Sequence, residues 1–235
     1  MELKTIDLGV LPFKDAFSEQ VRIQKAVFEG LLPSTLILCE HPHTITLSRQ
    51  AKLSNLIDYA LIRDSNIDLI IGLDRGGDIT YHGPGQLMGY FLFDLRQFRR
   101  DLGLFLSNIE RVLTSALTTI GIDVKTKDGY RGAWVGDRKI ASIGIGVNKW
   151  VTIHGFGLNV NTDLKYFNLI KPCGLDVKMT SMKEESGREL DINLVKREIA
   201  NQVREIFSLE IDSSSPYFYN FRAGAEIVGA RPQLC

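Results

Sequence analysis

A glycine-rich stretch between two apolar segments carries the densest set of polar side chains in the chain. It spans residues 75–86 and reads Arg-Gly-Gly-Asp-Ile-Thr-Tyr-His-Gly-Pro-Gly-Gln. Glycine lets the backbone approach a ligand closely and adopt positive φ, and Arg75 supplies a planar cationic group. Two interpretations stay open, the wall of a ligand site or a long hairpin loop. It is not a phosphate-binding motif, because it lacks G-x-x-x-x-G-K-[ST] and no helix start follows at dinucleotide-fold spacing.

Cys173, between Pro172 and Gly174, is the best candidate nucleophile among the three cysteines. A thiolate is a strong nucleophile, and a thioester stays activated for a second transfer step. A free thiol has a pKa of about 8.5, and a nearby ammonium group favours the thiolate. From spacing alone, a buried structural thiol is the commoner fate of a free cysteine. We expect Cys39, within an apolar segment, to pack in the core, and Cys235 to be mobile at the end of the chain.

Lys139 begins an apolar segment that is typical of a strand. A lysine that faces the interior there is unfavourable unless it is paired, and burial lowers its pKa. The ordinary alternative is an edge lysine whose ammonium group reaches solvent. Spacing alone leaves both alternatives open.

The sequence Cys39-x-His41-x-His43 holds three possible metal ligands. An unbroken strand would place all three on one face, but Pro42 interrupts it and no fourth ligand is evident. We therefore predict no metal site.

Composition narrows the class of protein. The chain has 235 residues, of which 44% are hydrophobic, enough for one domain with a sizeable core. Its 28 basic and 28 acidic residues balance, which argues against a dedicated nucleic-acid binder. Three widely spaced cysteines favour a reducing compartment. The N-terminus shows no signal pattern, and no apolar run approaches the ~20 residues of a membrane span, so we expect a cytoplasmic protein without a membrane partner.

Apolar periodicity predicts the elements that must position these residues. Helical spacing predicts helices at 13–29, 104–120 and 194–207. Alternating or β-branched segments predict strands at 2–10, 34–39, 44–47, 67–73, 86–95, 124–127, 132–135, 139–147 and 151–160. Strands outnumber helices, and short turns join the later ones as hairpins. This indicates an α/β (α+β) fold, a single domain with a mixed, largely antiparallel sheet flanked by helices.

The motifs also resemble those of a known family. The string Arg75-Gly-Gly-Asp-x-Thr-Tyr-His-Gly-Pro-Gly-Gln86 is similar to the signature of lipoyl(octanoyl) transferases. Upstream, Glu40-His41-Pro42 and Arg49 resemble a second family segment, with Ser48 where the family has glycine. Three later blocks match in the same order, at 138–144, 154–160 and 172–175. The resemblance extends from about residue 10 to 207.

This resemblance implies a fold, a reaction and a site. The fold is that of the biotin and lipoate ligase catalytic domain, expected over residues 1–211, and residues 212–235 form a tail that we could not align. Cys173 carries the acyl group as a thioester, and Lys139 lowers the pKa of its thiol and relays protons. The residues that the resemblance assigns to the acyl substrate are Arg75, Gly76, Gly77, Asp78, Ile79, Thr80, Tyr81, His82, Ser142, Ile143, Gly144, Gly155, Phe156 and Gly157. Small residues leave room for an alkyl chain, and their amides can face a thioester carbonyl.

The partners follow from the same resemblance. The donor is an octanoyl-acyl carrier protein, which is acidic. The acceptor is a lysine of lipoyl domains, in 2-oxoacid dehydrogenases and the glycine cleavage H protein. No nucleotide, metal or other cofactor is implied. Arg96, Arg99 and Arg100 form a basic cluster, and Lys125 and Lys127 follow later in the chain. We hypothesise that some of these residues help to steer the carrier.

Three alternatives remain. An ATP-dependent lipoate or biotin ligase shares the fold but needs no catalytic cysteine, and the ligases' own glycine-rich signatures are absent. A non-catalytic protein that binds acyl carriers or lipoyl domains would have no use for both Cys173 and Lys139. A thioesterase would need a base for water, and the sequence offers no separate one.

Overall fold

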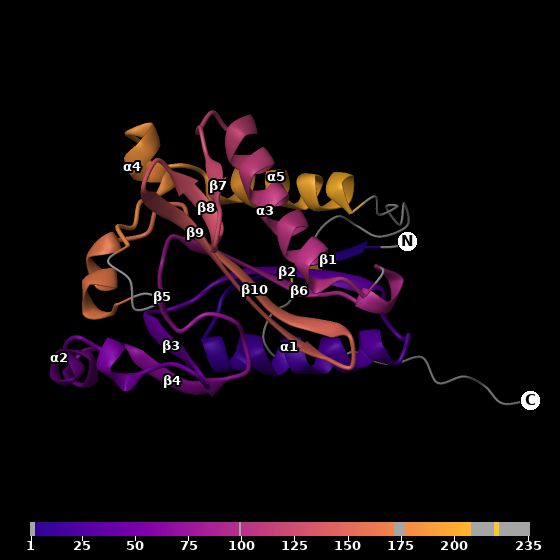
Figure 1. The fold of residues 1–235 in the computed structure, drawn as a ribbon, viewed down its shortest axis with the longest axis horizontal. Helices are drawn as coiled ribbons and strands as arrows, with labels where there is room; N and C mark the ends of the chain where they lie inside the picture. Colours follow the sequence, from indigo (N-terminus) through magenta and orange to yellow (C-terminus); the bar gives the residue numbers. More distant parts are fainter. Residues whose placement is uncertain (1–2, 99, 172–176, 208–218, 221–235) are drawn as a thin grey trace, which may run out of the picture.

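The structure is a computed structural model that describes residues 3–98, 100–171, 177–207 and 219–220. Within these residues, an eight-stranded mixed sheet forms the centre (Figure 1). From edge to edge it contains β11 (Tyr219–Asn220), β1 (Leu3–Val10), β2 (Ser34–Glu40), β6 (Gln86–Leu92), β10 (Val151–Asn159), β9 (Arg138–Asn148), β8 (Tyr130–Val135) and β7 (Lys125–Lys127). Strand β1 pairs in parallel with β2 and β11, and the other neighbours are antiparallel.

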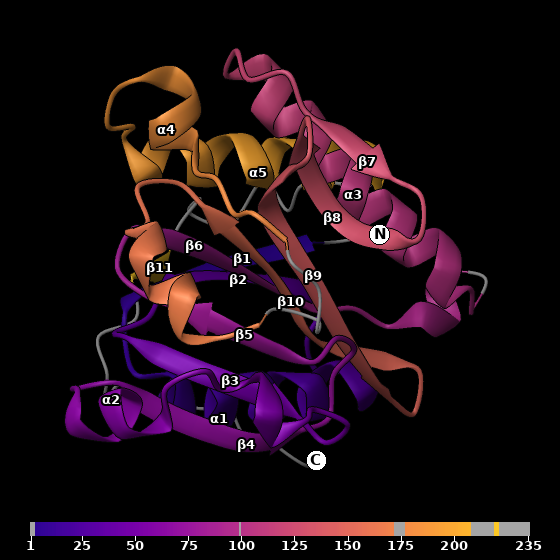
Figure 2. The same ribbon diagram turned by 60° about the vertical axis from the view of Figure 1, so that its left-hand side comes forward.

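A separate three-stranded sheet lies beside the large one (Figure 2). Its order is β4 (Asp68–Leu73), β3 (Thr44–Ser48) and β5 (Ile79–His82), with β3 parallel to β4 and antiparallel to β5. The predicted mixed α/β fold is confirmed, and the second sheet is an addition to it.

Helices cover both faces of the large sheet. Helix α1 (Phe13–Phe28) packs on one face, and α3 (Leu102–Thr119) and α5 (Ile192–Ile206) pack on the other (Figures 1 and 2). Two short helices, α2 (Tyr59–Asp64) and α4 (Met182–Ser186), and three 3₁₀ turns complete the described elements, the turns lying at Leu53–Asn55, Leu95–Gln97 and Leu164–Leu169. None of the helices in the described ranges is long and apolar enough to cross a bilayer.

The sequence explains the long elements. In β2, Leu36 and Leu38 enter the core under α3 and α5, whereas Ile37 and Cys39 pack toward α1, as strand alternation requires. Helix α1 buries residues spaced three and four apart, which form a single stripe: Phe13, Ala16, Gln20, Ile23 and Val27.

Helix ends also follow local chemistry. The Asp101 carboxylate accepts a hydrogen bond from the Leu104 amide at 2.9 Å and caps the start of α3. Gly30 follows α1 with a φ of +73°, the left-handed conformation in which glycine commonly ends helices.

The predicted elements are confirmed within a few residues, with three corrections. The predicted strand 86–95 ends earlier, at Leu92. Residues 79–82, which we had included in the glycine-rich stretch, form β5. Helices α2 and α4 were not predicted. Of the tail 212–235, only Tyr219–Asn220 lies within the described residues, where it adds β11 to the sheet edge. The division into a domain at 1–211 and a tail stays a prediction.

Candidate active site

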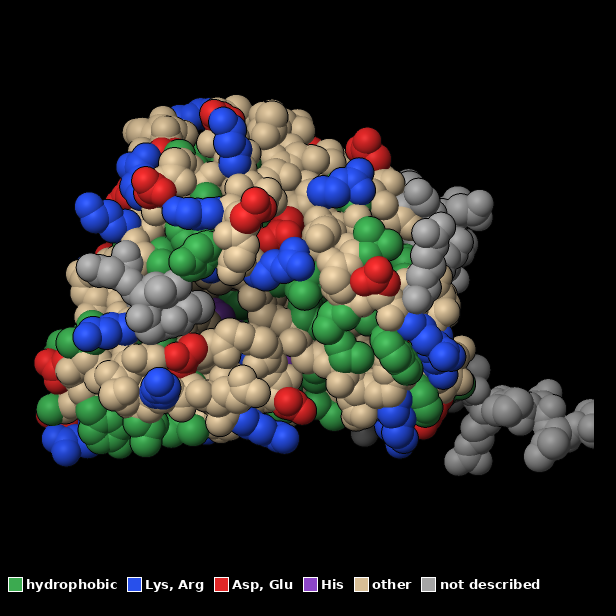
Figure 3. All heavy atoms as spheres, viewed as in Figure 1, with side chains coloured by type: hydrophobic (Ala, Val, Ile, Leu, Met, Phe, Trp, Pro, Cys, Tyr) green, Lys and Arg blue, Asp and Glu red, His purple; other side chains and the backbone are tan. Residues whose placement is uncertain are grey.

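A cavity of about 470 Å³ lies between the three-stranded sheet and strands β6, β9 and β10. Apolar side chains make up much of its wall, including Phe13, Met88, Leu102, Leu106, Ile143, Phe156 and Met179. Its size and mixed lining are those of small-molecule sites in proteins. Figure 3 shows a hollow on this face of the molecule.

The three segments that the family motifs single out converge on this cavity. Every residue predicted to bind the acyl substrate lines it except Tyr81, and Lys139 lines it as well. Tyr81 lies on the opposite side of β5, where its hydroxyl bonds His43 Nδ1 at 2.7 Å and its ring stacks on Tyr166.

The loop 74–76 rests directly on β9. The Gly76 amide donates to the Ile145 carbonyl at 2.9 Å. A Cβ at Gly144 would lie 2.8 Å from the Gly76 oxygen, and one at Gly146 would lie 2.2 Å from the Asp74 oxygen. Only glycine therefore permits this approach, which closes one wall of the cavity.

Arg75 anchors the glycine-rich loop to β3. Its Nη2 lies 2.9 Å from both the carbonyl oxygen and the hydroxyl of Thr46, and 3.3 Å from the Asp78 carbonyl. One carboxylate oxygen of Asp78 accepts a hydrogen bond from Asn55 Nδ2 at 2.5 Å. The other, Oδ1, is buried and has no hydrogen bond within the described part of the chain.

A directed series of hydrogen bonds crosses the cavity wall. Gln86 Nε2 donates to the Tyr81 carbonyl at 3.2 Å and to Asn159 Oδ1 at 2.9 Å, so Gln86 Oε1 is left as an acceptor. It accepts from His82 Nδ1 at 2.9 Å. Burial lowers the pKa of His82 to about 3, so the ring is neutral and its Nε2 accepts from the Thr46 hydroxyl at 3.1 Å.

This series continues at both ends. The Thr46 hydroxyl accepts from Arg75, and Asn159 Nδ2 donates to the Thr180 carbonyl at 2.9 Å. We call this set the polar chain, and its members are Arg75, Thr46, His82, Gln86, Asn159 and Thr180. All of its donors point in the same direction along the series. The polar chain links the three-stranded sheet to the large sheet and then to residue 180.

Two further histidines lie near the cavity. His41 Nδ1 bonds the Leu11 carbonyl at 2.8 Å, which leaves Nε2 to accept from the Tyr90 hydroxyl at 2.6 Å. Burial lowers the pKa of His41 to about 4. His154 lines the cavity with a φ of +65° and stacks on Phe17, and burial together with the charge of Arg75 lowers its pKa to about 3. These rings are therefore neutral at physiological pH.

Lys139 occupies the start of β9 and is 9% exposed. Its amide donates to the Lys178 carbonyl at 2.8 Å, and its carbonyl accepts from the Thr180 amide at 2.9 Å. Its ammonium nitrogen lies 5.2 Å from the centre of the Trp134 ring. The backbone of residues 178–180 is thus fixed against the candidate catalytic lysine, and Asn159 of the polar chain holds the same residues from the other side.

Neighbouring strand β8 leaves space for this lysine. A Cβ at Gly132 would lie 2.9 Å from Cε of Lys139, and the φ of Gly132 is +134°. Glu110 of α3 accepts from the Gly132 amide at 3.1 Å and forms an ion pair with Arg131 at 2.7 Å. Helix α3 therefore fixes the backbone opposite Lys139.

Cys173, with Pro172, Gly174 and Leu175, lies outside the described residues. The described residues that flank this segment are Lys171 and Val177. The Lys171 amide donates to the Asn55 carbonyl at 2.8 Å, and Val177 lines the cavity.

The other two cysteines differ from this candidate. Cys39 is fully buried, and burial raises the pKa of its thiol far above the ordinary value, which makes it unreactive. Its expected place in the core is confirmed. Cys235 lies outside the described residues.

The three possible metal ligands do not converge. Cys39 Sγ lies 3.8 Å from His41 Nε2, but the His41 ring also bonds Leu11 and Tyr90, and His43 lies apart and bonds Tyr81. Across the described ranges, no group of three or more His, Cys, Asp or Glu side chains is arranged to hold a metal ion.

Several polar residues of the site were not among the predicted binding residues, including Gln86, Tyr90, His154 and Asn159. Gln86, His154 and Asn159 stand in the family blocks that we quoted, and Tyr90 follows the first of these blocks by four residues. Their roles depend on contacts between strands that are distant in sequence.

Comparison with known proteins agrees with the geometry. Residues 13–204 match the family described as the lipoyl protein ligase A/B catalytic domain, and the chain belongs to this family. An octanoyltransferase of Syntrophotalea carbinolica is 40% identical over 200 residues, which cover 85% of this chain and 90% of the relative. One of Solibacter usitatus is 39% identical over 204 residues, covering 87% and 92%. The predicted resemblance is confirmed, as is membership of an acyltransferase group.

Solved structures show the same fold. A putative lipoate protein ligase from T. acidophilum with bound lipoic acid has a TM-score of 0.70 at 14% identity, covering 95% of this chain and 91% of that one. A lipoate-protein ligase A bound with ATP has a TM-score of 0.68 at 15% identity, covering 91% and 90%. The expected relation to the ligase catalytic-domain fold is confirmed.

Proposed function

We propose that this chain transfers an octanoyl group from octanoyl-acyl carrier protein to a lysine of lipoyl domains, through a thioester on Cys173. The acceptors are the lipoyl domains of 2-oxoacid dehydrogenases and the glycine cleavage H protein. The main support is the cavity itself, where an apolar wall built from the three family segments meets Lys139. The names of the curated relatives support the acyl group transferred.

The first step loads the enzyme. The Cys173 thiolate attacks the carbonyl carbon of the carrier thioester, and a new carbon–sulfur bond forms as the bond to the carrier sulfur breaks. The Lys139 ammonium gives its proton to the departing carrier thiolate, which leaves as a thiol. Lys139 suits this role because it is buried beside apolar groups and is held by residues 178–180.

The second step transfers the acyl group. The neutral amine of the acceptor lysine attacks the octanoyl-enzyme, forming an amide and releasing the Cys173 thiolate. The now neutral Lys139 takes the proton that the amine loses, which restores the starting thiolate and ammonium. Protons balance over the two steps, and the donor thioester supplies the activated acyl group that a ligase would make with ATP.

Structural relatives with bound lipoate or ATP make the ligase the main alternative. A ligase activates a free acid with ATP, whereas a transferase begins from a thioester. The presence of Cys173 within a family block favours the transferase. The low and scattered cysteine content favours the cytoplasm as the place of the reaction.

The test is transfer without nucleotide. Purified chain, octanoyl-carrier protein and a lipoyl domain are mixed in the absence of ATP, and the mass of the lipoyl domain is followed. We expect octanoylation at one lysine, with no stimulation by ATP. Octanoylation that appears only with free octanoate and ATP would identify a ligase and reject the proposal.

A further inference from the structure

Unusual backbone conformations gather at one place on the surface. Among the described residues, four that are not glycine have a positive φ: Arg100, Lys149, Trp150 and His154. Lys149 and Trp150 form the turn between β9 and β10, and the Arg100 guanidinium lies 5.9 Å from the centre of the Trp150 ring. Three of the four therefore belong to a single cluster.

The turn is built from the wrong residues for its geometry. Asn148 pairs with Val151, so the loop has two residues, with φ of +50° at Lys149 and +66° at Trp150. Two-residue turns with both φ values positive strongly favour Asn-Gly, because side chains destabilise the left-handed conformation. Strain of this kind points to a use for the side chains.

The side chains of this turn and of Arg100 combine exposed apolar surface with positive charge. Trp150 is 42% exposed and Val147 is 39% exposed. Neither Lys149 nor Arg100 forms an ion pair in the part of the chain that the structure describes. Both residues are exposed, and each cation lies beside an aromatic ring, Lys149 at 5.0 Å from the centre of the Phe28 ring and Arg100 beside Trp150, so neither charge is neutralised by a carboxylate of the described residues.

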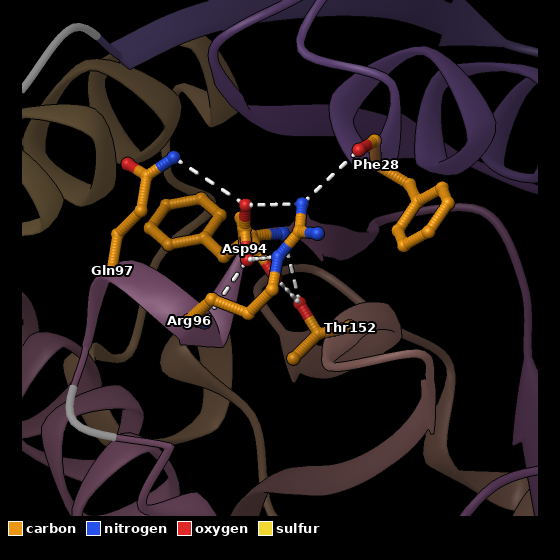
Figure 4. A network of polar contacts seen from close by, with 6 residues as sticks. Phe28, Asp94, Arg96, Gln97 and Thr152 are labelled. Carbon is orange, nitrogen blue, oxygen red and sulfur yellow. Dashed lines mark hydrogen bonds and ion pairs between the residues drawn. The ribbon is translucent and has the colours of Figure 1, made fainter.

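Arg96, from the predicted basic cluster, is different. Its guanidinium bonds the Asp94 carboxylate at 2.8 Å and the Phe28 carbonyl at 3.1 Å, so it ties η2 (Leu95–Gln97) to the end of α1 (Figure 4). The Arg96 charge is therefore already paired with the Asp94 carboxylate. Arg99 lies outside the described residues. Of the two arginines of this cluster that the structure describes, Arg100 is the one beside Trp150.

The cluster borders the cavity. Leu102 lines the cavity and is 38% exposed, and it follows Arg100 by two residues. Ile145 also lines the cavity and precedes Val147 by two residues. Figure 3 shows hydrophobic side chains over the tip of the β9–β10 hairpin, with basic side chains beside them. We name this surface the hairpin patch, and its members are Arg100, Leu102, Val147, Lys149 and Trp150.

We propose that the hairpin patch is the docking surface for the acidic acyl carrier protein that donates the octanoyl group. This inference rests on the proposed function. Unpaired cations beside an exposed tryptophan complement an acidic surface that has an apolar centre.

Distance favours the donor over the acceptor. Val147 is eight residues from Lys139 along β9, roughly 26 Å of extended strand. An acceptor lysine projects from its own protein surface by one side chain, so its domain must approach Lys139 closely. A carrier protein presents its acyl group at the end of a long prosthetic arm, so its surface can dock farther from the reacting groups than the surface of a lipoyl domain can.

The test replaces the strained turn with the sequence that its geometry prefers. The double variant Lys149→Asn and Trp150→Gly removes charge and apolar surface while relieving strain. We expect the KM for octanoyl-carrier protein to rise about tenfold at low salt. The difference should shrink at high salt, and the melting temperature should be unchanged or higher. Arg197→Asn is the charge-matched control and should change nothing, because Arg197 is exposed on α5, a helix that lies away from the tip of the β9–β10 hairpin in Figures 1 and 2.

Two further substrates separate the possible outcomes. The KM values for octanoyl-pantetheine, a donor without a carrier protein, and for the lipoyl domain should be unchanged in the double variant. An unchanged KM for the carrier would reject the docking surface, and a rise only for the lipoyl domain would assign the patch to the acceptor instead. Wild-type chain that transfers from neither donor would contradict the proposed function, and this inference with it.

Discussion

Replacing Asn159 by alanine removes the link between the polar chain and residues 178–180. Asn159 is 1% exposed, accepts from Gln86 at 2.9 Å and donates to the Thr180 carbonyl at 2.9 Å. Gln86 keeps its bond to Tyr81, but the Thr180 carbonyl loses this donor inside the protein. An unsatisfied buried group costs about 1–3 kcal/mol and a lost hydrogen bond about 1 kcal/mol, so we expect about 2–4 kcal/mol of destabilisation.

The same change should reduce catalysis, because residues 178–180 hold the backbone of Lys139. We expect kcat for octanoyl transfer to fall at least tenfold in the folded variant, with a smaller change in KM. Denaturant titration gives the stability, and single-turnover transfer at a temperature where the variant is folded gives the rate. Alkylation of Cys173 against pH reports whether the thiol pKa has risen.

A matched control separates position from stability. The Asn161 side chain donates to the Leu190 carbonyl at 2.8 Å and accepts from the Leu190 amide at 3.0 Å, so it bonds a different segment from residues 178–180. Asn161→Ala should therefore also lose stability, by less because Asn161 and Leu190 are only half-buried, and should keep its transfer rate. Equal rate losses in the two folded variants, or an Asn159→Ala variant as active as wild type, would refute the positioning role.

Three other predictions test different parts of the account. Lys139→Met should lower the single-turnover transfer rate by about 100- to 10,000-fold, while Lys125→Met, on exposed β7 surface, should not; comparable rates in both variants would remove Lys139 from the mechanism. His41, His82 and His154 have folded pKa values of about 4, 3 and 3, below the unfolded value of about 6.5, so the unfolded chain binds more protons and stability falls as the pH drops through 6.5 toward 4. Each should contribute about 1.4 kcal/mol per pH unit in that window, and urea titrations with a flat pH dependence would contradict the burial of these rings. Shortening the donor from octanoyl to hexanoyl removes two methylenes from the apolar cavity, worth about 0.8 kcal/mol each, so kcat/KM should fall about 15-fold, and equal values would show that the acyl chain is not buried there.

Hydrophobic periodicity was sufficient to predict the long helices and strands. Helices α1, α3 and α5 and the strands of the β9–β10 hairpin show one period over nine or more residues, which single-sequence patterns can detect. Strand β5 is only four residues long and lies among glycines. Its pairing with β3, more than thirty residues earlier in the chain, decides its conformation, and no local signal specifies it.

The sequence predicted which segments line the site, but not how their side chains contact one another. The motifs correctly located the segments that form the cavity walls. Applying the two-residue alternation of a strand to residues 80–82 would have corrected the assignment of Tyr81 to the substrate site. Thr80 and His82 face the cavity, so Tyr81 between them must face the other way, toward Tyr166. The polar chain was not predictable, because its bonds join side chains from strands of two sheets.

The thioester on Cys173 is the central claim, and intact-protein mass tests it most directly. Wild-type chain is mixed with octanoyl-carrier protein without ATP, beside Cys173→Ser and the buried-cysteine control Cys39→Ser. We predict that wild type and Cys39→Ser each gain one octanoyl group that hydroxylamine removes and that disappears when lipoyl domain is added, while Cys173→Ser gains no such thioester. An adduct that persists in Cys173→Ser, or transfer to the lipoyl domain by wild type without any adduct at any time point, would contradict the account.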